Sequence, residues 1–234
     1  MEPILAIPTP NPRLPLALDH LVVAARSLDE GEQWLRTRLG RPLVAGGSHP
    51  GFGTHNRLLG LGAECYLELI ALDPAQANPP CVLFGLDQPA VMASIADTPR
   101  LLHLVFRVLP PFGLTSVLPK LAYDPGRPTG MVRGALAWDI TLTPDGRPRG
   151  AGLLPTIIDW GASAHPASRL PDSGIRLEWL ELTGPEAVIA EFPVPASPTK
   201  LELIAAPCST ICAAFLVDDR RIIIQSPLPL RDLA

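Results

Sequence analysis

The order of secondary-structure elements predicted for residues 16–72 constrains the fold more than any other feature of the sequence. A strand of branched apolar residues, LALDHLVVAA (16–25), precedes a helical segment, SLDEGEQWLRTRLG (27–40). Three more strands follow, RPLVAGG, THNRLLGL and ECYLELIAL, and glycine-rich turns separate them. We therefore predict a strand–helix–three-strand (βαβββ) module in an α+β protein.

Both ends of the predicted helix carry recognisable signals. Ser27 and Glu30 match a capping box, in which each side chain bonds to a free backbone amide of the first turn. Gly40 followed by Pro42 is typical of a helix C-terminus. Gly31 is expected to let the helix approach its neighbour closely.

The same order of elements recurs along the chain. RLLHLVFRV (100–108) begins a second cycle, with a weak helix at PFGLTSVLPKL and two strands, GALAWDITLTP and GLLPTIIDWG. IRLEWLELTG (175–184) begins a third cycle, in which Thr183 and Glu186 predict a capping box for the helix PEAVIAEF. Strands KLELIAAP, ICAAFLVDD and RRIIIQ then follow.

These cycles define the expected organisation of the chain. We predict an N-terminal extension over residues 1–15, and a domain over residues 16–170 that contains two modules, 16–72 and 100–160. Residues 171–234 form a third βαβββ-like segment that packs on the fold or completes it. The connection 73–99 is rich in proline and long enough to have a function of its own.

Composition excludes several classes of function. The formal net charge is −4, so the chain has no surplus of basic residues to bind nucleic acid. It contains no apolar run of roughly 20 residues, which a membrane-spanning helix needs, and its start does not resemble a signal peptide. The four cysteines, Cys65, Cys81, Cys208 and Cys212, form no CxxC motif. We therefore expect a cytoplasmic protein with reduced thiols and no membrane or nucleic-acid partner.

The amino-acid sequence of the first two modules resembles a known family. The segments LDHLVVAARSLDEGEQWL, GGSHPGFGTHNRLLGLG and YLELIALDP are similar, in this order, to the glyoxalase-like domain family of the vicinal oxygen chelate superfamily. LLPTIIDWG and HPASRLPDSGIRL are similar to a later part of that family. The resemblance implies repeated βαβββ modules whose mixed sheets curl around a cavity.

The resemblance also implies a metal centre and a small-molecule partner. A histidine from the first strand and a carboxylate from the last strand of each module hold the metal in the superfamily. Carried over to this chain, these ligands are His20, Glu68, His103 and Asp159. Such a set suits a divalent ion of Fe, Mn, Ni or Zn. A homodimer is a further expectation, because the superfamily pairs its modules.

Side-chain alternation gives a first test of these ligands. In regular strands His20 shares a face with Leu16, Leu18 and Val22, and Glu68 shares one with Tyr66. A histidine and a glutamate on apolar faces need partners, because burying an unpaired charge is costly. A metal ion satisfies both, and so does a direct hydrogen bond between them. For Asp159, the alternative role is to accept a hydrogen bond from a turn or helix amide.

The loop HPGFGTHN (49–56) supplies the candidates for substrate handling. His55, Asn56 and Arg57 begin the strand after it, where successive side chains point to opposite faces. If Asn56 faces the cavity, its amide hydrogen-bonds the substrate. If the other face does, His55 and Arg57 form a cationic pair suited to a carboxylate or an enediolate. A glycine turn whose polar groups bond only the local backbone is the third possibility.

Two classes of function follow. The first is a metal-dependent enzyme of lyase, isomerase or dioxygenase type that acts on a small oxygen-bearing substrate. The second is a metal-free protein that binds or sequesters a small molecule in a cavity lined by aromatic residues. The aromatic candidates are Phe52, Trp138, Trp160 and Trp179.

Overall fold

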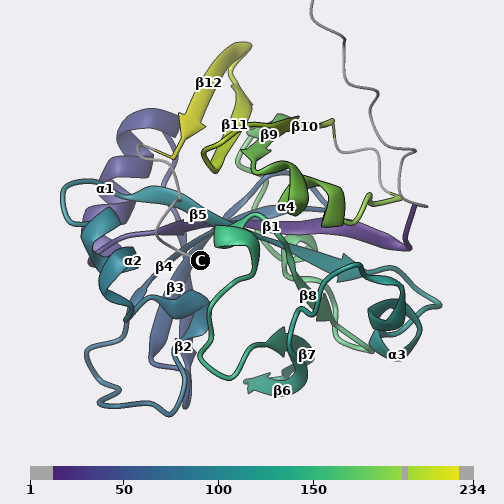
Figure 1. Ribbon diagram of the computed structural model, residues 1–234. Helices are drawn as coiled ribbons and strands as arrows, with labels where there is room; N and C mark the ends of the chain where they lie inside the picture. The colour runs from purple at the N-terminus through teal and green to yellow at the C-terminus, as the bar shows by residue number, and fades with distance from the viewer. Residues whose placement is uncertain (1–12, 197–199, 227–234) are drawn as a thin grey trace, which may run out of the picture.

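The computed structural model describes residues 13–196 and 200–226, which form two β-sheets and a small number of short helices (Figure 1). Residues 1–12 of the predicted extension, and residues 197–199 and 227–234 of the third segment, lie outside this description. The first module contains β1 (Leu16–Ala24), α1 (Leu28–Leu39), β2 (Val44–His49), β3 (Thr54–Gly60) and β4 (Tyr66–Leu72). The connection after it contains a 3-10 helix, η1 (Leu83–Gly85), and α2 (Pro89–Ser94).

The second and third cycles follow in the predicted order. The second contains β5 (Arg100–Val108), α3 (Leu114–Val117), η2 (Leu118–Lys120), β6 (Arg127–Arg133), β7 (Leu136–Leu142), η3 (Gly150–Gly152) and β8 (Thr156–Asp159). The short η4 (Pro166–Ser168) leads to the third, with β9 (Arg176–Gly184), α4 (Glu186–Glu191), β10 (Leu201–Ala205), β11 (Thr210–Val217) and β12 (Arg220–Gln225). Strand β6 was not predicted, because RPTGMVR contains a proline and a glycine and only one branched apolar residue, Val132.

The first two modules together build one sheet. Its strand order is β2-β3-β4-β1-β5-β8-β7-β6, so each module supplies one half. In each half the first strand lies parallel to the last, and the two first strands, β1 and β5, pair antiparallel at the centre. The edge strands β2 and β6 contact each other, so the sheet curls back on itself. The predicted α+β architecture of βαβββ modules in a curled mixed sheet is confirmed.

The curled sheet separates two hydrophobic cores. The concave core contains inward side chains such as Val22, Ile70, Val105 and Ile158, and the connection 73–99 packs into it. The larger convex core lies beneath α1 and the second sheet. Side chains on the concave face are therefore enclosed by both halves of the sheet, where a small-molecule site is expected.

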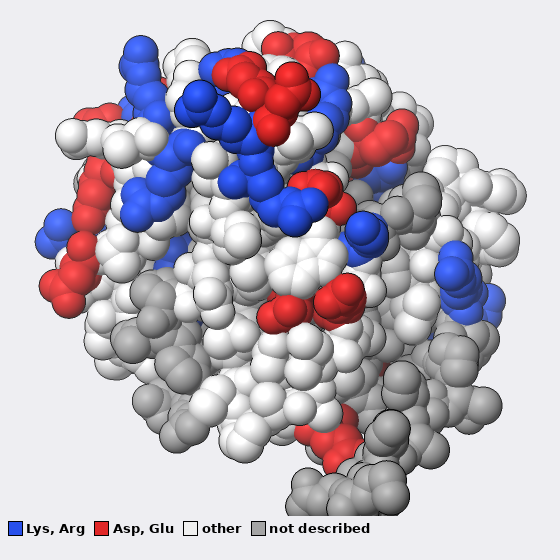
Figure 2. Space-filling view, turned by 90° about the horizontal axis from the view of Figure 1, so that it is seen from above, with Lys and Arg blue, Asp and Glu red and all other residues white. Residues whose placement is uncertain are grey.

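The third cycle forms the second sheet, with strand order β10-β9-β11-β12. Its elements follow the βαβββ order, but its first strand lies parallel to its second strand rather than to its last. Residues of β9 and β11 join the convex core, so this sheet packs on the outside of the first. Figure 2 views this side of the molecule and shows basic and acidic side chains interleaved over it.

A β-bulge in β1 changes the predicted faces of this strand. The pairing of β1 with β5 shifts between Leu18 and His20, so Asp19 is an extra residue. Leu16 and Leu18 consequently pack in the convex core, whereas Val22 packs in the concave core. The prediction that His20 shares a face with Leu16 and Leu18 is therefore wrong, because alternation fails across the bulge.

The helix termini confirm the predicted N-cap at Ser27 but not the reciprocal half of its capping box, because the Glu30 carboxylate bonds Arg26 instead, and they correct the cap predicted at Thr183. The Ser27 hydroxyl accepts a hydrogen bond from the Glu30 amide at 3.2 Å, and Gly40 ends α1 with φ 67°. Thr183, in contrast, lies inside β9, and α4 begins after Pro185 without a side-chain cap. The four cysteines form no disulfide. No helix within residues 13–196 and 200–226 is long and apolar enough to cross a bilayer.

Gly31 sets how closely α1 approaches the sheet. A Cβ atom at this position would lie 2.3 Å from Leu69 Cδ1 and 2.9 Å from Ala25 Cβ. Overpacking of this kind costs about 1–3 kcal/mol, which exceeds the gain of up to about 1 kcal/mol from the higher helix propensity of alanine. We therefore expect Gly31→Ala to lower the free energy of unfolding by about 1 kcal/mol or more, measured by urea denaturation.

The exposed Gln33 of the same helix provides the matched control. Gln33→Ala should change the free energy of unfolding by less than about 0.5 kcal/mol, because it removes no buried contact. Equal stability of Gly31→Ala and wild type would show that α1 does not depend on this close approach.

Candidate functional site

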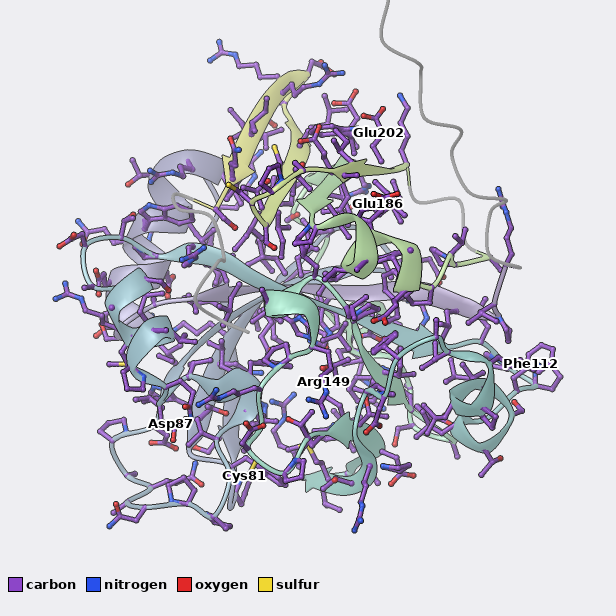
Figure 3. All side chains as sticks on the ribbon, in the orientation of Figure 1. Cys81, Asp87, Phe112, Arg149, Glu186 and Glu202 are labelled. Carbon is purple, nitrogen blue, oxygen red and sulfur yellow. The ribbon has the colours of Figure 1, made fainter. Side chains whose placement is uncertain are left out.

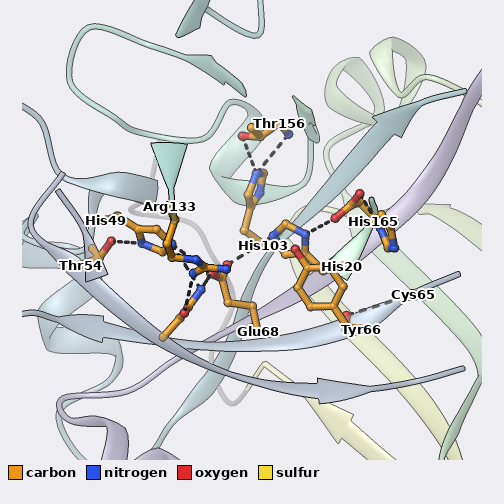
Figure 4. Close-up of polar contacts among 12 residues, drawn as sticks. His20, His49, Thr54, Cys65, Tyr66, Glu68, His103, Arg133, Thr156 and His165 are labelled. Atoms are coloured by element: carbon orange, nitrogen blue, oxygen red, sulfur yellow. Dashed lines mark hydrogen bonds and ion pairs between the residues drawn. The ribbon is translucent and has the colours of Figure 1, made fainter. Parts of the chain in front are cut away.

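His20 lies between two carboxylates on the concave face (Figure 4). Its Nδ1–H donates to Asp19 Oδ1 at 2.6 Å, and its Nε2 lies 3.3 Å from Glu68 Oε2. The Tyr66 ring stacks on the imidazole with 4.6 Å between centroids. His20 and Glu68 are 4% and 5% exposed, so the ion pair is shielded from water. The structure thus brings together the two predicted residues of the first module.

Asn56 and His49 lie on the side of Glu68 that faces away from His20. The Asn56 Nδ2 amide donates to Glu68 Oε1 at 2.5 Å and lies 3.3 Å from His49 Nε2. His49 Nδ1–H donates to the Thr54 hydroxyl at 2.8 Å, so Nε2 of the neutral ring carries the lone pair. Of the two adjacent residues His55 and Asn56, Asn56 therefore faces inward, beside His49 of the same segment.

Arg133 reaches the same cluster from the opposite half of the sheet. Its Nη1 donates to Asn56 Oδ1 at 3.2 Å, and the same oxygen accepts from the Gly47 amide at 2.9 Å. A Cβ atom on Gly46 would lie 1.9 Å from Asn56 Oδ1, and one on Gly47 would lie 3.0 Å from Arg133 Cδ. The paired glycines therefore make the room in which Asn56 and Arg133 meet.

Asp19 is the centre of a second set of hydrogen bonds. Its Oδ2 accepts from Trp160 Nε1 at 2.8 Å and from His165 Nε2 at 2.9 Å. These donors come from the segment after β8, which fixes the Asp19 carboxylate and, through it, the His20 ring. Sequence analysis did not select Asp19 as a site residue, although Asp19 and His20 are the only polar residues of their strand.

Their surroundings shift the pKa values of His20 and Glu68 in opposite directions. Burial opposes the charged forms of both partners, but the hydrogen bonds to Asp19 and Glu68 raise the pKa of His20 to about 9. The bond from His20 lowers the pKa of Glu68 to about 2 against the same effect of burial. Burial lowers the pKa of His49, which stays neutral. At neutral pH the cluster therefore contains an imidazolium, a carboxylate and a neutral imidazole as separate groups.

His103 shares the concave face but has different partners. Its Nδ1–H donates to the Gly152 carbonyl at 2.8 Å. Its Nε2 accepts from the Thr156 amide at 3.2 Å and from the Thr156 hydroxyl at 2.9 Å. Burial lowers the pKa of this histidine to about 4, so the ring is neutral at physiological pH. Both nitrogens are occupied by protein groups, and neither contacts His20 or Glu68 within hydrogen-bonding distance.

Asp159 lies on the other face of its strand. Ile158 and Trp160 belong to the concave core and Ile157 to the convex core, so alternation turns Asp159 outward. Its carboxylate accepts from the Leu114 amide at 3.3 Å and from the Gly161 amide at 2.9 Å. The structure does not bring Asp159 to the His20–Glu68 pair. It instead fulfils the alternative role, in which Asp159 bonds a helix amide and a turn amide.

His55 and Arg57 also face away from the concave side. The Arg57 guanidinium binds Glu32 at 2.5 Å and Asp29 at 2.7 Å, both on α1. It therefore holds α1 against β3 rather than facing a cavity. The cationic pair of His55 and Arg57, one of the alternatives for this strand, therefore does not form, and Arg133 reaches the cluster through Asn56.

The metal centre implied by the resemblance needs four donors around one ion. His20 and Glu68 suit two of them, because Asp19 fixes Nδ1 and directs Nε2 toward Glu68. Two ligands of a tetrahedral zinc ion lie about 3.4 Å apart, close to the 3.3 Å between Nε2 and Oε2. His103 and Asp159 do not join them, and the described part of the chain contains no group of three His, Cys, Asp or Glu residues that fits a metal ion. The residues present do not fit the four-ligand centre.

A cavity of about 620 Å³ adjoins the cluster. Trp138 and Trp160 line it, with 5.3 Å between their ring centroids. Because Trp160 also donates to Asp19, the cavity and the charged cluster share this side chain. Of the other aromatic candidates, Phe52 packs against the concave core, whereas Trp179 lies in β9 of the second sheet.

The opposite pKa shifts of two histidines predict where stability is greatest. Between pH 6.5 and about 9, His20 holds a proton only in the folded state, so the free energy of unfolding falls as pH rises. Between about 4 and 6.5, His103 holds a proton only in the unfolded state, so the free energy of unfolding rises with pH. We expect a maximum near pH 6.5 in urea denaturation.

Two variants isolate the alkaline part of this profile. His20→Gln should flatten the decline between pH 6.5 and about 9, because it removes the group that gains a proton on folding. His55→Gln, which changes a half-buried histidine on the other face, should keep the decline. The same decline in His20→Gln as in wild type would contradict the assignment of the proton to His20.

Comparison with one solved structure shows the same fold, and two further structures align less closely. A hypothetical protein from Staphylococcus aureus aligns with a TM-score of 0.52 and 12% identity over 92% of this chain and 87% of that chain. Methylmalonyl-CoA epimerase from Mycobacterium tuberculosis aligns with a TM-score of 0.40 and 21% identity, over 62% of this chain and 87% of the epimerase. A Streptomyces coelicolor methylmalonyl-CoA epimerase variant in complex with 2-nitronate-propionyl-CoA aligns with a TM-score of 0.40 and 18% identity. The alignment covers 62% of this chain and 97% of that chain.

A comparison with curated proteins finds no match to this chain. A comparison with protein families matches residues 18–192 to the glyoxalase-like domain family. The match begins at the strand that carries His20, includes both modules, and extends into the second sheet. This chain therefore belongs to the glyoxalase-like domain family.

Proposed function

We propose that this protein is an enzyme that transfers a proton within a small oxygen-bearing substrate, as an isomerase or a lyase does. The observation that carries the proposal is the His20–Glu68 pair, which is buried on the concave face with its nitrogen and oxygen 3.3 Å apart. Environments that drive the pKa values of two neighbouring groups apart identify the acid and the base of such a site. His20 is then the general acid and Glu68 the general base.

The proposed chemistry divides between these two residues. Glu68 accepts a proton from a carbon next to a carbonyl group, and His20 donates a proton to the carbonyl oxygen as negative charge develops there. Asp19 acts through His20, because its carboxylate holds the ring in the orientation that presents Nε2. The Asn56 amide holds Glu68 Oε1 and leaves Oε2 directed at His20.

Arg133 supports a substrate with an acidic group. Its half-buried guanidinium donates one hydrogen bond within the cluster, to Asn56, and has several more N–H groups for a substrate oxygen. A guanidinium binds a carboxylate through two parallel hydrogen bonds, which fixes the orientation of the bound molecule. We therefore propose a small carbonyl acid as the substrate class.

A divalent metal ion bound to His20 and Glu68 is the alternative way to stabilise the same developing charge. When bound, such an ion polarises a carbonyl oxygen without a proton from the protein. The geometry of His103 and Asp159 does not supply the remaining ligands, so we assign no step to a metal ion. The metal-dependent lyase, isomerase or dioxygenase stays a prediction that metal analysis and a chelator test.

Binding without turnover is the second candidate function. The Trp138–Trp160 pair supports it, because two large aromatic rings line the 620 Å³ cavity next to the cluster. In that case the polar residues would only orient a ligand. The two functions differ in whether a bound ligand exchanges protons with solvent.

Proton exchange tests the enzyme directly. In D₂O the protein should catalyse exchange of the hydrogen next to the carbonyl group in at least one member of a panel of small carbonyl acids, followed by ¹H NMR. Glu68→Gln should lower the exchange rate by about 10²–10⁴-fold, because it removes the base. Glu202→Gln, which changes an exposed carboxylate of the second sheet, should stay within about twofold of wild type.

The same assay distinguishes the alternatives. Exchange should persist in the presence of EDTA, and loss of exchange that zinc or manganese restores would contradict the metal-free mechanism. No exchange above the Glu68→Gln background in any panel member would contradict the proposed enzyme. Saturable binding of a panel member without exchange would identify the binding protein.

Arg133 gives an independent prediction about substrate class. Arg133→Gln should raise KM for an acid substrate by about 10-fold or more with a smaller change in kcat, because the guanidinium binds the carboxylate in both the ground state and the transition state. The exposed Arg127 on the same strand is the control, and Arg127→Gln should leave KM unchanged. An unchanged KM in Arg133→Gln would exclude Arg133 as the carboxylate anchor.

A further inference from the structure

A second cavity, of about 230 Å³, lies between the connection 73–99 and the loop before β8. It is separate from the Trp138–Trp160 cavity and shares no lining residue with it. Figure 3 labels Asp87 and Arg149, which belong to the two chain segments that border it. Most of the lining is apolar: Phe84, Pro89, Ala90, Val91, Leu102 and Pro148.

The walls of this cavity are built from unusual backbone. Phe84 and Ala151 have φ values of 55° and 54°, which non-glycine residues rarely adopt. The neighbouring Gly85 and Gly152 also have positive φ. Backbone of this kind persists only where the surrounding structure holds it, and it concentrates at functional sites.

His103 holds both walls in place. Its Nδ1–H donates to the carbonyl of Gly152, a lining residue, and its ring contacts the Phe84 ring with 5.2 Å between centroids. The remaining nitrogen is anchored to Thr156. A buried neutral histidine therefore joins the two segments that form the cavity, which gives His103 a positioning role in place of the predicted metal ligation.

The polar groups of the cavity lie together. Gln88 and Arg147 are the polar side chains of the lining, and the Arg147 guanidinium hydrogen-bonds Gln88 Oε1. Arg147 also lies 3.3 Å from Asp145, in an exposed ion pair of a kind that contributes little stability. Its side chain is 46% exposed, so the guanidinium is accessible from solvent. An apolar chamber with one accessible cation is complementary to an amphiphilic anion.

We propose that this cavity binds a small carboxylate whose body is one aromatic ring or a branched aliphatic chain. A dry cavity of about 150 Å³ holds a benzene ring, so the present volume accepts a ring with a short acidic arm. The ring packs among Phe84, Val91 and Leu102, and the carboxylate bonds to Arg147. This site does not depend on the proton-transfer function proposed for His20 and Glu68.

Phenylacetate is the probe that tests the proposal. In ¹H–¹⁵N NMR titrations of the full chain, phenylacetate should give saturable shifts of the amides of residues 84–91 and 147–152. The neutral analogue 2-phenylacetamide should bind about tenfold more weakly, because it cannot form a charge-assisted bond to Arg147. Acetate, which lacks the ring, should give no saturable shift.

Variants assign the binding to this cavity. Arg147→Gln should abolish the preference for phenylacetate over phenylacetamide, whereas Arg149→Gln, two residues further on and outside the cavity lining, should keep it. Ala90→Phe should fill the chamber and remove binding of both probes. Ala90 is only half-buried, so the variant should fold, which an unchanged NMR spectrum elsewhere in the chain checks.

Other outcomes would overturn the proposal. These are the absence of saturable shifts, shifts centred on residues 20, 56 and 68 instead, or equal behaviour of Arg147→Gln and Arg149→Gln. If Ala90→Phe fails to fold, the two arginine variants decide. Phenylacetate binding that is about tenfold weaker in Arg147→Gln, with unchanged carbonyl-acid exchange, separates this site from the proposed active site.

Discussion

Three ionisable side chains lie together in the interior of this protein. Because their opposite charges must neutralise one another there, they determine which side chains surround them. Asp19, His20 and Glu68 are each 5% exposed or less, so none of their charges is stabilised by bulk water. A buried charge without a partner is strongly destabilising, whereas a hydrogen-bonded set of opposite charges is tolerated. Trp160, His165 and Asn56 donate the remaining hydrogen bonds to these carboxylates. They tie β3 and the segment after β8 to the same point.

In both modules a histidine of the first strand contacts a side chain of the last strand, but that partner differs in chemical type. In the first, a histidine of the opening strand contacts a carboxylate of the last strand, His20 with Glu68. In the second, His103 contacts Thr156, a hydroxyl in place of the carboxylate. Carboxylate partners raise the pKa of His20 to about 9, whereas burial beside neutral groups lowers that of His103 to about 4. The partner therefore decides the role of each histidine: His20 beside a carboxylate is a candidate catalytic acid, whereas His103 beside a hydroxyl positions a cavity wall.

The sequence predicted the order of elements and half of the candidate site. Hydrophobic alternation and glycine turns located the strands that carry His20 and Glu68, and the resemblance paired them. The face of His20 was assigned wrongly because a bulge at Asp19 interrupts the alternation, and no residue type marks a bulge in a strand of branched apolar residues. Arg133 was missed because it lies at the end of a strand, β6, whose proline and glycine weaken the strand pattern.

The remaining differences concern contacts between segments that are far apart in the chain. The family resemblance placed Asp159 and His103 at ligand positions, but strand alternation turns Asp159 outward, and Gly152 and Thr156 occupy both nitrogens of His103. The partners of Arg57 on α1 are likewise set by tertiary packing, which local patterns do not record. Predictions from pattern therefore held for elements and failed where the partner of a polar group decides its role.

The charge state of the two strand histidines tests this account most directly. Long-range ¹H–¹⁵N NMR of histidine rings, assigned with His20→Gln and His103→Gln, reports the protonation of each nitrogen as a function of pH. We predict that His20 is protonated on both nitrogens up to about pH 9, and that His103 carries only its Nδ1 proton down to about pH 4. A neutral His20 ring at pH 7 would contradict the account, because an imidazolium between two carboxylates is its central feature.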